Sequence, residues 1–384
     1  MNFDLTEPQS AFQNSVRVFA NRHLAEGAVP RAHEERFPWD VAKAMARAGL
    51  FGIMLPESQG GAGGTLMDAV LAMEQIATIC PRSADVLQAG NFGAFRTFAE
   101  YATPQQRERY FARLLAGETI AAVAMSEPEA GSALTDLTTT CSPDGEGWRL
   151  NGNKVFTSNT EDAGVFLVYC RFGPGTGGIG SVLVERGAEG FTFAPPSRYM
   201  NGETWCAMNF DNVRIDPENL LLGPGGFRKQ IAGFNIERIG NTTRALALGE
   251  YCFQQAKAHA ETRRQFGRSL SEFQGIQWKF SEMRVALDAA QLLLYRAAHS
   301  GESGLPDPQQ VAIAKYACNQ AGWMAANESL QVMGGTGYSQ DLLLEYCVRK
   351  TRGWMIAGGS LEMMKNRIAE GVFARSFSQR PPRA

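Results

Sequence analysis

The chain has 384 residues, of which 44% are hydrophobic and 20% charged, and its formal net charge is −2 at pH 7. These values are typical of a globular protein with roughly two or three domains. No run of lysine and arginine is longer than a pair such as Arg263–Arg264, which argues against a nucleic-acid-binding or anionic membrane-binding surface. We therefore expect small molecules or further copies of the chain as partners.

Cysteine and histidine spacing gives no sign of a disulfide framework or a metal site. The seven cysteines are scattered without a CxxC pair, which suits reduced thiols in a cytosol, and His23, His33, His259 and His299 lack ligand spacing. The first residues lack a basic segment followed by an apolar one, and no run of about 18 apolar residues occurs. These features predict a cytoplasmic protein without an export signal or a membrane span.

The first third of the chain is predicted to be helical. Thr6 followed by Gln9, with Pro8 in the first turn, is typical of a capped helix start. Helical spacing of apolar residues follows, for example at 15–25 and 39–55, with a glycine-rich loop at 57–65 between helices. The helical spacing ends near residue 118.

The predicted secondary structure then changes twice along the chain. From about 119 to 228, β-rich runs alternate with turn clusters, which favours a small antiparallel barrel or sandwich; the runs are 119–125, 147–158, 164–171, 180–186 and 205–215. Long helical segments such as 250–266 and 280–300 follow, before a polar tail that is expected to fray. We predict an α+β chain with three domains, at 1–118, 119–228 and 229–384. A cleft where such layers meet is a usual place for a cofactor.

The segment AMSEPEAGSALTDLTTT, residues 124–140, follows an apolar strand and gathers small and hydroxyl residues, including Ser126, Gly131 and Ser132. Glycine lacks a Cβ, so backbone N–H groups there can approach a flat or anionic ligand closely, and hydroxyl groups add donors. Composition alone favours a tight β connection over a ligand-binding loop.

This segment and four others together resemble the acyl-CoA dehydrogenase family. The others are LNGNKVFTSN (150–159), RRQFGRSLSEFQGIQ (263–277), QVMGGTGYSQD (331–341) and GGSLEMMKNRIA (358–369). They occur in the family's order and spacing and cover essentially the whole chain. The resemblance implies an N-terminal helical domain, a central β domain and a C-terminal four-helix bundle, with FAD as cofactor.

The resemblance also implies where FAD binds. Met125, Ser126, Gly131 and Ser132 would wrap the flavin ring, and Phe156, Thr157 and Ser158 would flank its other side, with the Ser158 hydroxyl toward N5. An alternative makes Phe156 a strand core residue. Residues assigned to the pyrophosphate and adenosine of a neighbouring subunit's FAD are Arg263, Phe266, Gln274, Gln331, Gly334 and Gly335, and Ser360 and Glu362 are also assigned to the cofactor.

Sharing of FAD between subunits implies a homo-oligomer, either a dimer or a tetramer. Arginine suits the pyrophosphate because its guanidinium can form two parallel bonds to phosphate oxygens. The competing interpretation makes RRQFG a helix C-terminus with Gly267 as its cap, and MGG at 333–335 another cap. Both interpretations can hold together.

Members of the family remove the pro-R α-proton of an acyl thioester with a carboxylate while the β-hydrogen leaves as hydride to flavin N5. In many members the base lies where this chain has Gly358. Isovaleryl-CoA and long-chain acyl-CoA dehydrogenases instead carry a glutamate 26 residues before the arginine of the RxxFG motif, which here is Glu237. The resemblance therefore implies a divergent member with Glu237 as base.

Charge spacing supports an enclosed Glu237. Between 231 and 256 the charged residues are Glu237, Arg238, Arg244 and Glu250, which indicates a mostly buried helix. The alternative is a solvated pair of Glu237 with Arg238, but neighbouring residues point about 100° apart on a helix.

The remaining expectations concern substrate and partners. By resemblance, Arg238 and Ser132 would contact the nucleotide or pantetheine end of the thioester, and Gly358 and Gly359 would lie near its reacting carbons. The acyl handle would be coenzyme A or a carrier protein, and an electron-transferring flavoprotein would accept the electrons. Ala133, Glu129 and Gly353 depart from the family pattern. Two alternatives stay open, a flavin monooxygenase of the same fold and a catalytically silent binding scaffold.

Overall fold

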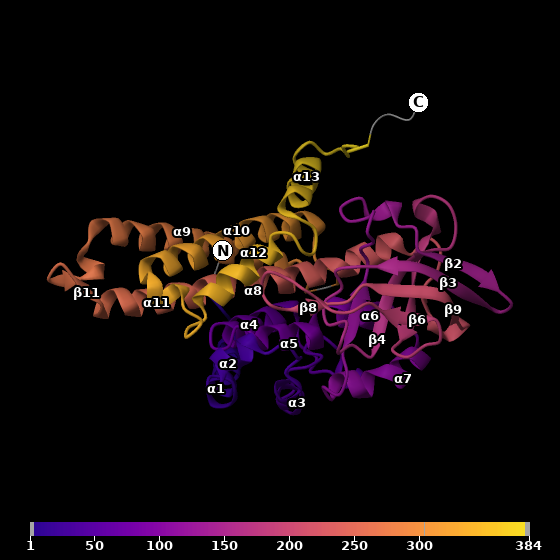
Figure 1. The fold of residues 1–384 in the computed structure, drawn as a ribbon, viewed down its shortest axis with the longest axis horizontal. Coiled ribbons are helices and arrows are strands. Elements are labelled where there is room, and N and C mark those ends of the chain that lie inside the picture. The colour runs from indigo at the N-terminus through magenta and orange to yellow at the C-terminus, as the bar shows by residue number, and fades with distance from the viewer. Residues whose placement is uncertain (1–3, 303, 381–384) are drawn as a thin grey trace.

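The computed structural model describes residues 4–302 and 304–380, and the chain begins with a layer of helices, the lower part of Figure 1. Thr6 caps the first helix: its side chain accepts from the backbone of Gln9, and the Gln9 side chain accepts from the backbone of Thr6. The predicted capped start is therefore confirmed. The helices are α1 (Glu7–His23), α2 (Ala28–His33), α3 (Trp39–Arg47), α4 (Leu66–Ala77), α5 (Ser83–Asn91), α6 (Gly93–Tyr101) and α7 (Pro104–Leu115).

A β part follows, on the right of Figure 1. Its main sheet has the strand order β10-β5-β4-β2-β3-β9-β6, with β1 paired to β4, and β7 and β8 form a separate hairpin. The strands are β1 (Ala121–Ala124), β2 (Thr140–Asp144), β3 (Gly147–Lys154), β4 (Val165–Arg171), β5 (Ile179–Glu185), β6 (Phe191–Phe193), β7 (Ser197–Arg198), β8 (Thr204–Trp205), β9 (Met208–Ile215) and β10 (Leu220–Leu222).

The expectation of purely antiparallel pairing is wrong at two places. β1 runs parallel to β4, with Ala121 opposite Val165, and β2 has one parallel pairing with β4, at Thr140 and Arg171. Parallel neighbours need a crossover instead of a hairpin, and here β2 and β3 lie between β1 and β4 in sequence. The other strand pairs are antiparallel.

Helices return in the C-terminal part, where α8 (Phe227–Thr262), α9 (Gln274–His299), α10 (Pro308–Met333) and α12 (Leu344–Trp354) form the four-helix bundle. Two further helices, α11 (Gly335–Tyr338) and α13 (Leu361–Val372), flank it, and a small hairpin of β11 (Arg264–Gln265) and β12 (Arg268–Ser269) follows α8. Gly249 and Gly322 allow α8 and α10 to touch, because a Cβ at Gly249 would lie 2.7 Å from the Gly322 Cα.

Helix α8 joins all three parts of the molecule. Its 36 residues span about 54 Å at 1.5 Å per residue, from the β part to the β11–β12 hairpin at the far end of the bundle (Figure 1). Most residues between 233 and 256 are buried, which confirms the predicted burial. One hydrophobic core cluster includes Leu71 of α4, Phe166 of β4 and Leu248 of α8.

Across residues 4–302 and 304–380, helices long enough to cross a bilayer are too polar to do so.

Candidate active site

Glu237 lies on the face of α8 that packs against α5 and α6. Its Oε2 accepts a hydrogen bond of 2.5 Å from Nε2 of Gln88, and the backbone N–H of Gly93 donates to the same carboxyl group. Burial raises the pKa of Glu237, while Arg244, Gln88 and Lys315 act in the opposite direction without reversing the rise. The side chain is therefore a partly buried carboxyl group that is held at one oxygen.

The interpretation of Glu237 and Arg238 as a solvated ion pair is wrong. Arg238 turns away from Glu237, because its Nη1 donates to Asn235 Oδ1 at 2.6 Å and its Nε donates to the Gly358 carbonyl at 3.0 Å. Burial lowers the pKa of Arg238 to about 10. Arg238 thereby ties α8 to the loop between α12 and α13.

That loop carries Gly358 and Gly359, both with positive φ, at 72° and 92°. Left-handed backbone at two successive residues suits glycine because neither has a Cβ to clash with the neighbouring carbonyl. Beneath the loop lies Lys315 of α10, whose Nζ donates to the carbonyls of Ala357 at 2.9 Å and Trp354 at 3.0 Å. Burial lowers the pKa of Lys315 to about 7.

The loop between β1 and β2, here called the Ser126 loop (residues 125–139), lies beside the segment that follows β3. The Val155 backbone N–H donates to the Ser126 carbonyl at 2.9 Å, and the Thr157 hydroxyl donates to the Val123 carbonyl at 3.4 Å. Two of the segments that the sequence predicted to form one site are thus adjacent.

Several residues of the Ser126 loop and of the segment after β3 are exposed to solvent. Phe156 has φ 58° and is 59% exposed, with its ring centroid 4.6 Å from that of Trp205, so its interpretation as a strand core residue is wrong because β3 ends at Lys154. Gly131 and Ser132 are exposed. Glu127 and Ala130 exchange two backbone hydrogen bonds of 3.1 and 3.2 Å, so the Ser126 loop also contains the tight turn that composition favoured.

Sequence reasoning missed the ion pair that supports the Ser126 loop. Lys154 Nζ lies 2.8 Å from Glu127 Oε1 and also donates to the Met125 carbonyl at 3.1 Å, and both side chains are buried. Glu127 further accepts from the backbone N–H groups of Thr138 and Thr139. A lysine inside the run LNGNKVF was the available signal, because a buried strand position rarely carries an unpaired charge.

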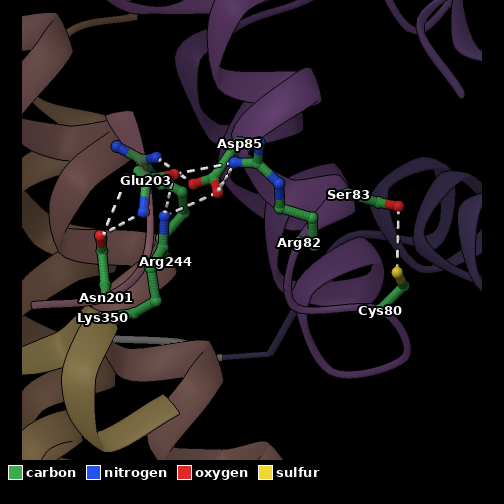
Figure 2. Close-up of polar contacts among 8 residues, drawn as sticks. All are labelled: Cys80, Arg82, Ser83, Asp85, Asn201, Glu203, Arg244 and Lys350. Atoms are coloured by element: carbon green, nitrogen blue, oxygen red, sulfur yellow. Dashed lines mark hydrogen bonds and ion pairs between the residues drawn. The ribbon is translucent and has the colours of Figure 1, made fainter. Parts of the chain in front are cut away.

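A second missed feature is the buried ion cluster formed by Arg82, Asp85, Glu203, Arg244 and Lys350 (Figure 2). Asp85 receives bonds from Arg244 at 2.6 Å, Lys350 at 2.7 Å and Arg82 at 3.0 Å, and Glu203 receives bonds from Lys350 at 2.6 Å and Arg82 at 2.8 Å. The cluster joins α5, α8 and α12 to the turn between β7 and β8. It therefore fixes the hairpin that carries Trp205 against the bundle.

The second predicted cofactor group lies at the other end of the bundle, near β11 and α11 in Figure 1. Arg263 follows Glu237 by 26 residues, which is about 39 Å along α8. These six residues are therefore far from the Ser126 loop of the same chain, and the structure does not bring the two groups together. They are Arg263, Phe266, Gln274, Gln331, Gly334 and Gly335.

Residues of this distal group are accessible. Phe266 is 95% exposed at the tip of the β11–β12 hairpin, and within the part of the chain that the structure describes the exposed Arg263 guanidinium has no ion-pair partner. A Cβ at Gly334 or Gly335 would meet no described atom within 4 Å. Gly267 does not cap α8, which ends at Thr262, because the chain turns into the hairpin there; Gly334 does cap α10.

Ser360 and Glu362 stand at the start of α13, next to Gly358 and Gly359. The Ser360 hydroxyl caps the helix by accepting from the Met363 N–H at 3.4 Å, and hydrogen bonds lower the pKa of the exposed Glu362. Both residues lie next to the Arg238 contact in sequence, not in the distal segments.

Among the described residues, no group of three or more His, Cys, Asp or Glu side chains is arranged to hold a metal ion. All seven cysteines lie in the described ranges, where they are buried and form no disulfide.

Comparison with known proteins covers nearly the whole chain. Models of the acyl-CoA dehydrogenase N-terminal, middle and C-terminal domains match residues 6–118, 122–213 and 224–373. A 3-sulfinopropanoyl-CoA desulfinase from Paraburkholderia xenovorans is 32% identical over 98% of this chain and 99% of its own length. A short-chain specific acyl-CoA dehydrogenase from Clostridium acetobutylicum is 30% identical over 97% and 100%.

Solved structures have the same fold. A glutaryl-coenzyme A dehydrogenase in complex with glutaryl-CoA matches with a TM-score of 0.92 and 28% identity, over 99% of this chain and 98% of that chain. The predicted order of a helical domain, a β domain and a helical bundle is therefore confirmed. The chain belongs to the acyl-CoA dehydrogenase family of FAD-dependent oxidoreductases.

Proposed function

We propose that this protein binds FAD and dehydrogenates an acyl thioester to the 2-enoyl thioester, with Glu237 as the base that removes the α-proton. Bound FAD would accept the β-hydrogen as hydride at N5. The observation that carries the proposal is the partly buried Glu237 carboxyl group on α8, held by Gln88 and adjacent in sequence to Arg238, which contacts Gly358.

The surroundings of Glu237 favour a base. Burial raises its pKa, and a carboxylate with a raised pKa binds a proton more strongly once it is ionised. Gly358 has no side chain, so the position at which many relatives carry their base offers no competing carboxylate. Arg238 and the loop at 358–359 would then hold the thioester beside Glu237, with Ser132 contacting its nucleotide or pantetheine end.

The residues present fit FAD. Exposed glycine and hydroxyl groups of the Ser126 loop, with Phe156 standing out of the sheet, leave room for a flat ring, and Met125, Ser126, Gly131, Ser132 and Ser158 would supply its walls and donors. Thr157 would flank the ring through its backbone, because its side chain is buried and its hydroxyl donates to the Val123 carbonyl. The exposed Arg263 and the open backbone at Gly334 and Gly335 suit a pyrophosphate. Phe266, Gln274 and Gln331 complete this distal cradle, and Ser360 and Glu362 would contact the cofactor from the start of α13.

FAD binding would require a second copy of the chain. The distal cradle lies about 39 Å from Glu237 along α8, so a cradle on one copy must serve the Ser126 loop of another. Exposed apolar side chains recur every seven residues on α9, at Trp278, Val285 and Leu292, which suits packing against a neighbouring helix. We therefore propose a homo-oligomer, a dimer or tetramer.

Coenzyme A or a carrier protein would supply the thioester, and an electron-transferring flavoprotein would take the electrons, as the family resemblance suggests. A second candidate reaction follows from the desulfinase relative, which is 32% identical over nearly the full length. A desulfinase breaks a carbon–sulfur bond, whereas dehydrogenation removes two hydrogens from adjacent carbons. Release of sulfite distinguishes desulfination from dehydrogenation.

The experiment is an anaerobic titration of the purified protein with a panel of acyl thioesters that includes 3-sulfinopropanoyl-CoA, following flavin absorbance and sulfite. We expect bleaching by at least one acyl thioester, slowed about a hundredfold or more in Glu237→Gln, because general bases contribute roughly 10²–10⁴-fold. Glu250→Gln, on the same helix and paired with Arg284 at 3.0 Å, is the control and should bleach at the parent rate.

Four results would contradict the proposal. Parent-rate bleaching of Glu237→Gln would exclude Glu237 as base. Sulfite release with no thioester that bleaches the flavin would favour the desulfinase reaction. A colourless protein that takes up no FAD would favour a binding scaffold, and productive oxygen consumption by the reduced protein with a co-substrate would favour a monooxygenase.

A further inference from the structure

Gln88 reaches from α5 to Glu237 across 149 residues of sequence. It is 7% exposed, and its Nε2 donates to Glu237 Oε2 at 2.5 Å. The Gly93 N–H at the start of α6 donates to the same carboxyl group. A Cβ at Gly93 would lie 2.9 Å from Oε2, so it is this oxygen that faces the junction of α5 and α6.

The chain leaves space for the Gln88 amide. A Cβ at Gly240, three residues after Glu237, would lie 2.2 Å from Gln88 Oε1 and 2.6 Å from Cγ of Phe92. Glycine at this position of α8 therefore admits the amide to the helix surface. Helical glycine costs roughly 0.5–1 kcal/mol relative to alanine, so the close approach is retained against a local preference.

The other end of the same amide has no such partner. Gln88 Oε1 is buried, and among residues 4–302 and 304–380 no group donates to it. A buried carbonyl oxygen without a donor is unfavourable and calls for an explanation. The hydrogen bond from Nε2 to Glu237 explains the buried oxygen, because an amide that places its nitrogen against Glu237 must bury its oxygen beside it.

We propose that Gln88 is a positioning residue that holds Oε2 of Glu237 and leaves Oε1 to receive the substrate proton. This inference rests on the proposed function. Gln88 donates to Oε2, and Gly93 lies on the same side because a Cβ there would be 2.9 Å from Oε2, so the carboxyl group can take a proton on Oε1 without losing the Gln88 bond. The base then keeps one orientation in its ionised and protonated states.

Several charged groups also act on Glu237 and must be separated from Gln88. Arg244 and Arg238 share helix α8 with it, and Lys315 faces it from α10. Arg244 is paired with Asp85 of α5, and Asp85 is also paired with Lys350 of α12. Replacing Gln88 by an uncharged residue leaves these charges in place, so a change in Glu237 titration reports on the hydrogen bond.

Gln88→Met is the test variant, because methionine keeps the length of the side chain and removes its donor. Thr97→Val is the matched control: Thr97 is 2% exposed, faces α8 at Gly233, and its hydroxyl is also buried without a partner in the described ranges. Both variants lose a buried polar group that packs against α8, and Gln88→Met alone loses a bond to Glu237.

Infrared spectra from pH 5 to 9, taken as differences against Glu237→Gln in each background, follow the carboxyl C=O band without turnover. We expect its midpoint to rise by about one pH unit in Gln88→Met, because hydrogen bonds to charged groups favour the ionised form by an amount of that order. The acid limb of anaerobic flavin reduction should move equally. Both should stay in place in Thr97→Val.

An unmoved infrared midpoint and acid limb in folded Gln88→Met would overturn the inference. If that variant does not fold, Gln88→Asn, which withdraws the amide by one methylene, replaces it with the same expected rise and the same overturning result. Parent-rate bleaching by Glu237→Gln would instead defeat the proposed function, while the infrared titration would still decide whether Gln88 holds Glu237.

Discussion

Arg244 Nη1 lies 2.6 Å from Asp85 Oδ1, and this ion pair joins α8 to α5 seven residues beyond Glu237. Asp85 also binds Arg82 and Lys350, so a single carboxylate faces three cations in the buried cluster of Figure 2. Removing one partner from a buried ionic network leaves the others uncompensated, which typically costs about 3–5 kcal/mol.

We therefore expect Asp85→Asn to lower the free energy of unfolding by about 3–5 kcal/mol in urea denaturation at pH 7. Glu261→Gln is the control, because Glu261 pairs with Lys257 on the exposed surface of α8 at 3.0 Å and such pairs contribute about 0.5 kcal/mol or less. Equal stabilities of the two variants would mean that the cluster contributes no more than a surface pair.

The acid dependence of this effect follows from the Asp85 titration. Burial opposes ionisation, but Lys350, Arg244 and Arg82 outweigh it and hold the pKa of Asp85 below its usual range. A carboxyl group with a depressed folded-state pKa stabilises the fold above its unfolded pKa of about 3.9 and loses that contribution as pH falls. The difference between parent and Asp85→Asn should thus persist at pH 5 and shrink below about pH 4.

The ion pair of Glu127 with Lys154 should stabilise the Ser126 loop. Glu127→Gln would leave Lys154 buried without its counter-charge, and we expect a loss of about 3–5 kcal/mol in unfolding free energy together with weaker FAD retention. Glu129→Gln lies two residues away in the same loop but is exposed, so it should change stability by less than about 0.5 kcal/mol. Urea denaturation and the flavin-to-protein absorbance ratio check both expectations. Identical FAD retention in the two variants would contradict the supporting role.

Sequence reasoning located features that depend on spacing along one segment. The 26-residue interval from Glu237 to Arg263 is preserved because one helix spans most of it, and the longer strands were visible as apolar runs. Strands of two or three residues such as β6 and β7 were missed, since a strand that short shows no alternation of apolar and polar residues. The parallel pairing of β1 with β4 is set by tertiary packing and has no local signal.

Contacts between segments that are far apart in the sequence were the main features that sequence reasoning could not predict. Gln88 looks like an ordinary helical glutamine until α5 meets α8. Lys315 and Asp85 likewise stand among apolar neighbours on separate helices, and their partners come from elements far along the chain. Burial of each charge was foreseeable from its neighbours, but which groups compensate it depends on how helices are arranged in three dimensions.

Lys315 should make stability depend on pH in the alkaline range. Burial lowers its pKa to about 7, against about 10.4 in an unfolded chain, so between these values the unfolded chain binds more protons. Stability linked to this group is therefore lost as pH falls through 7 and present above about 10.4. The charged groups acting on it are Arg238, Glu237 and Arg244.

We expect the stability of the parent relative to Lys315→Met to increase from pH 7 to pH 9, by up to about 1.4 kcal/mol per pH unit. Urea denaturation at pH 7, 8 and 9 measures this difference. Lys229→Met, at an exposed position of α8, serves as control for the loss of a lysine that is not buried. A constant difference for Lys315→Met would show that Lys315 titrates alike in the folded and unfolded chains.

Assembly and FAD binding should fail together. Leu292 is 48% exposed on α9 and lies 18 residues from Gln274, about 27 Å, so it is remote from the distal cradle. Leu292→Asp would place a carboxylate in the apolar stripe and should give a monomer that loses FAD, because no second copy then presents Arg263 to the Ser126 loop. Light scattering and flavin absorbance measure the two effects. Val18→Asp, at a 57% exposed position of α1, should change neither, whereas a Leu292→Asp monomer that retained one FAD per chain would show that each chain binds the cofactor alone.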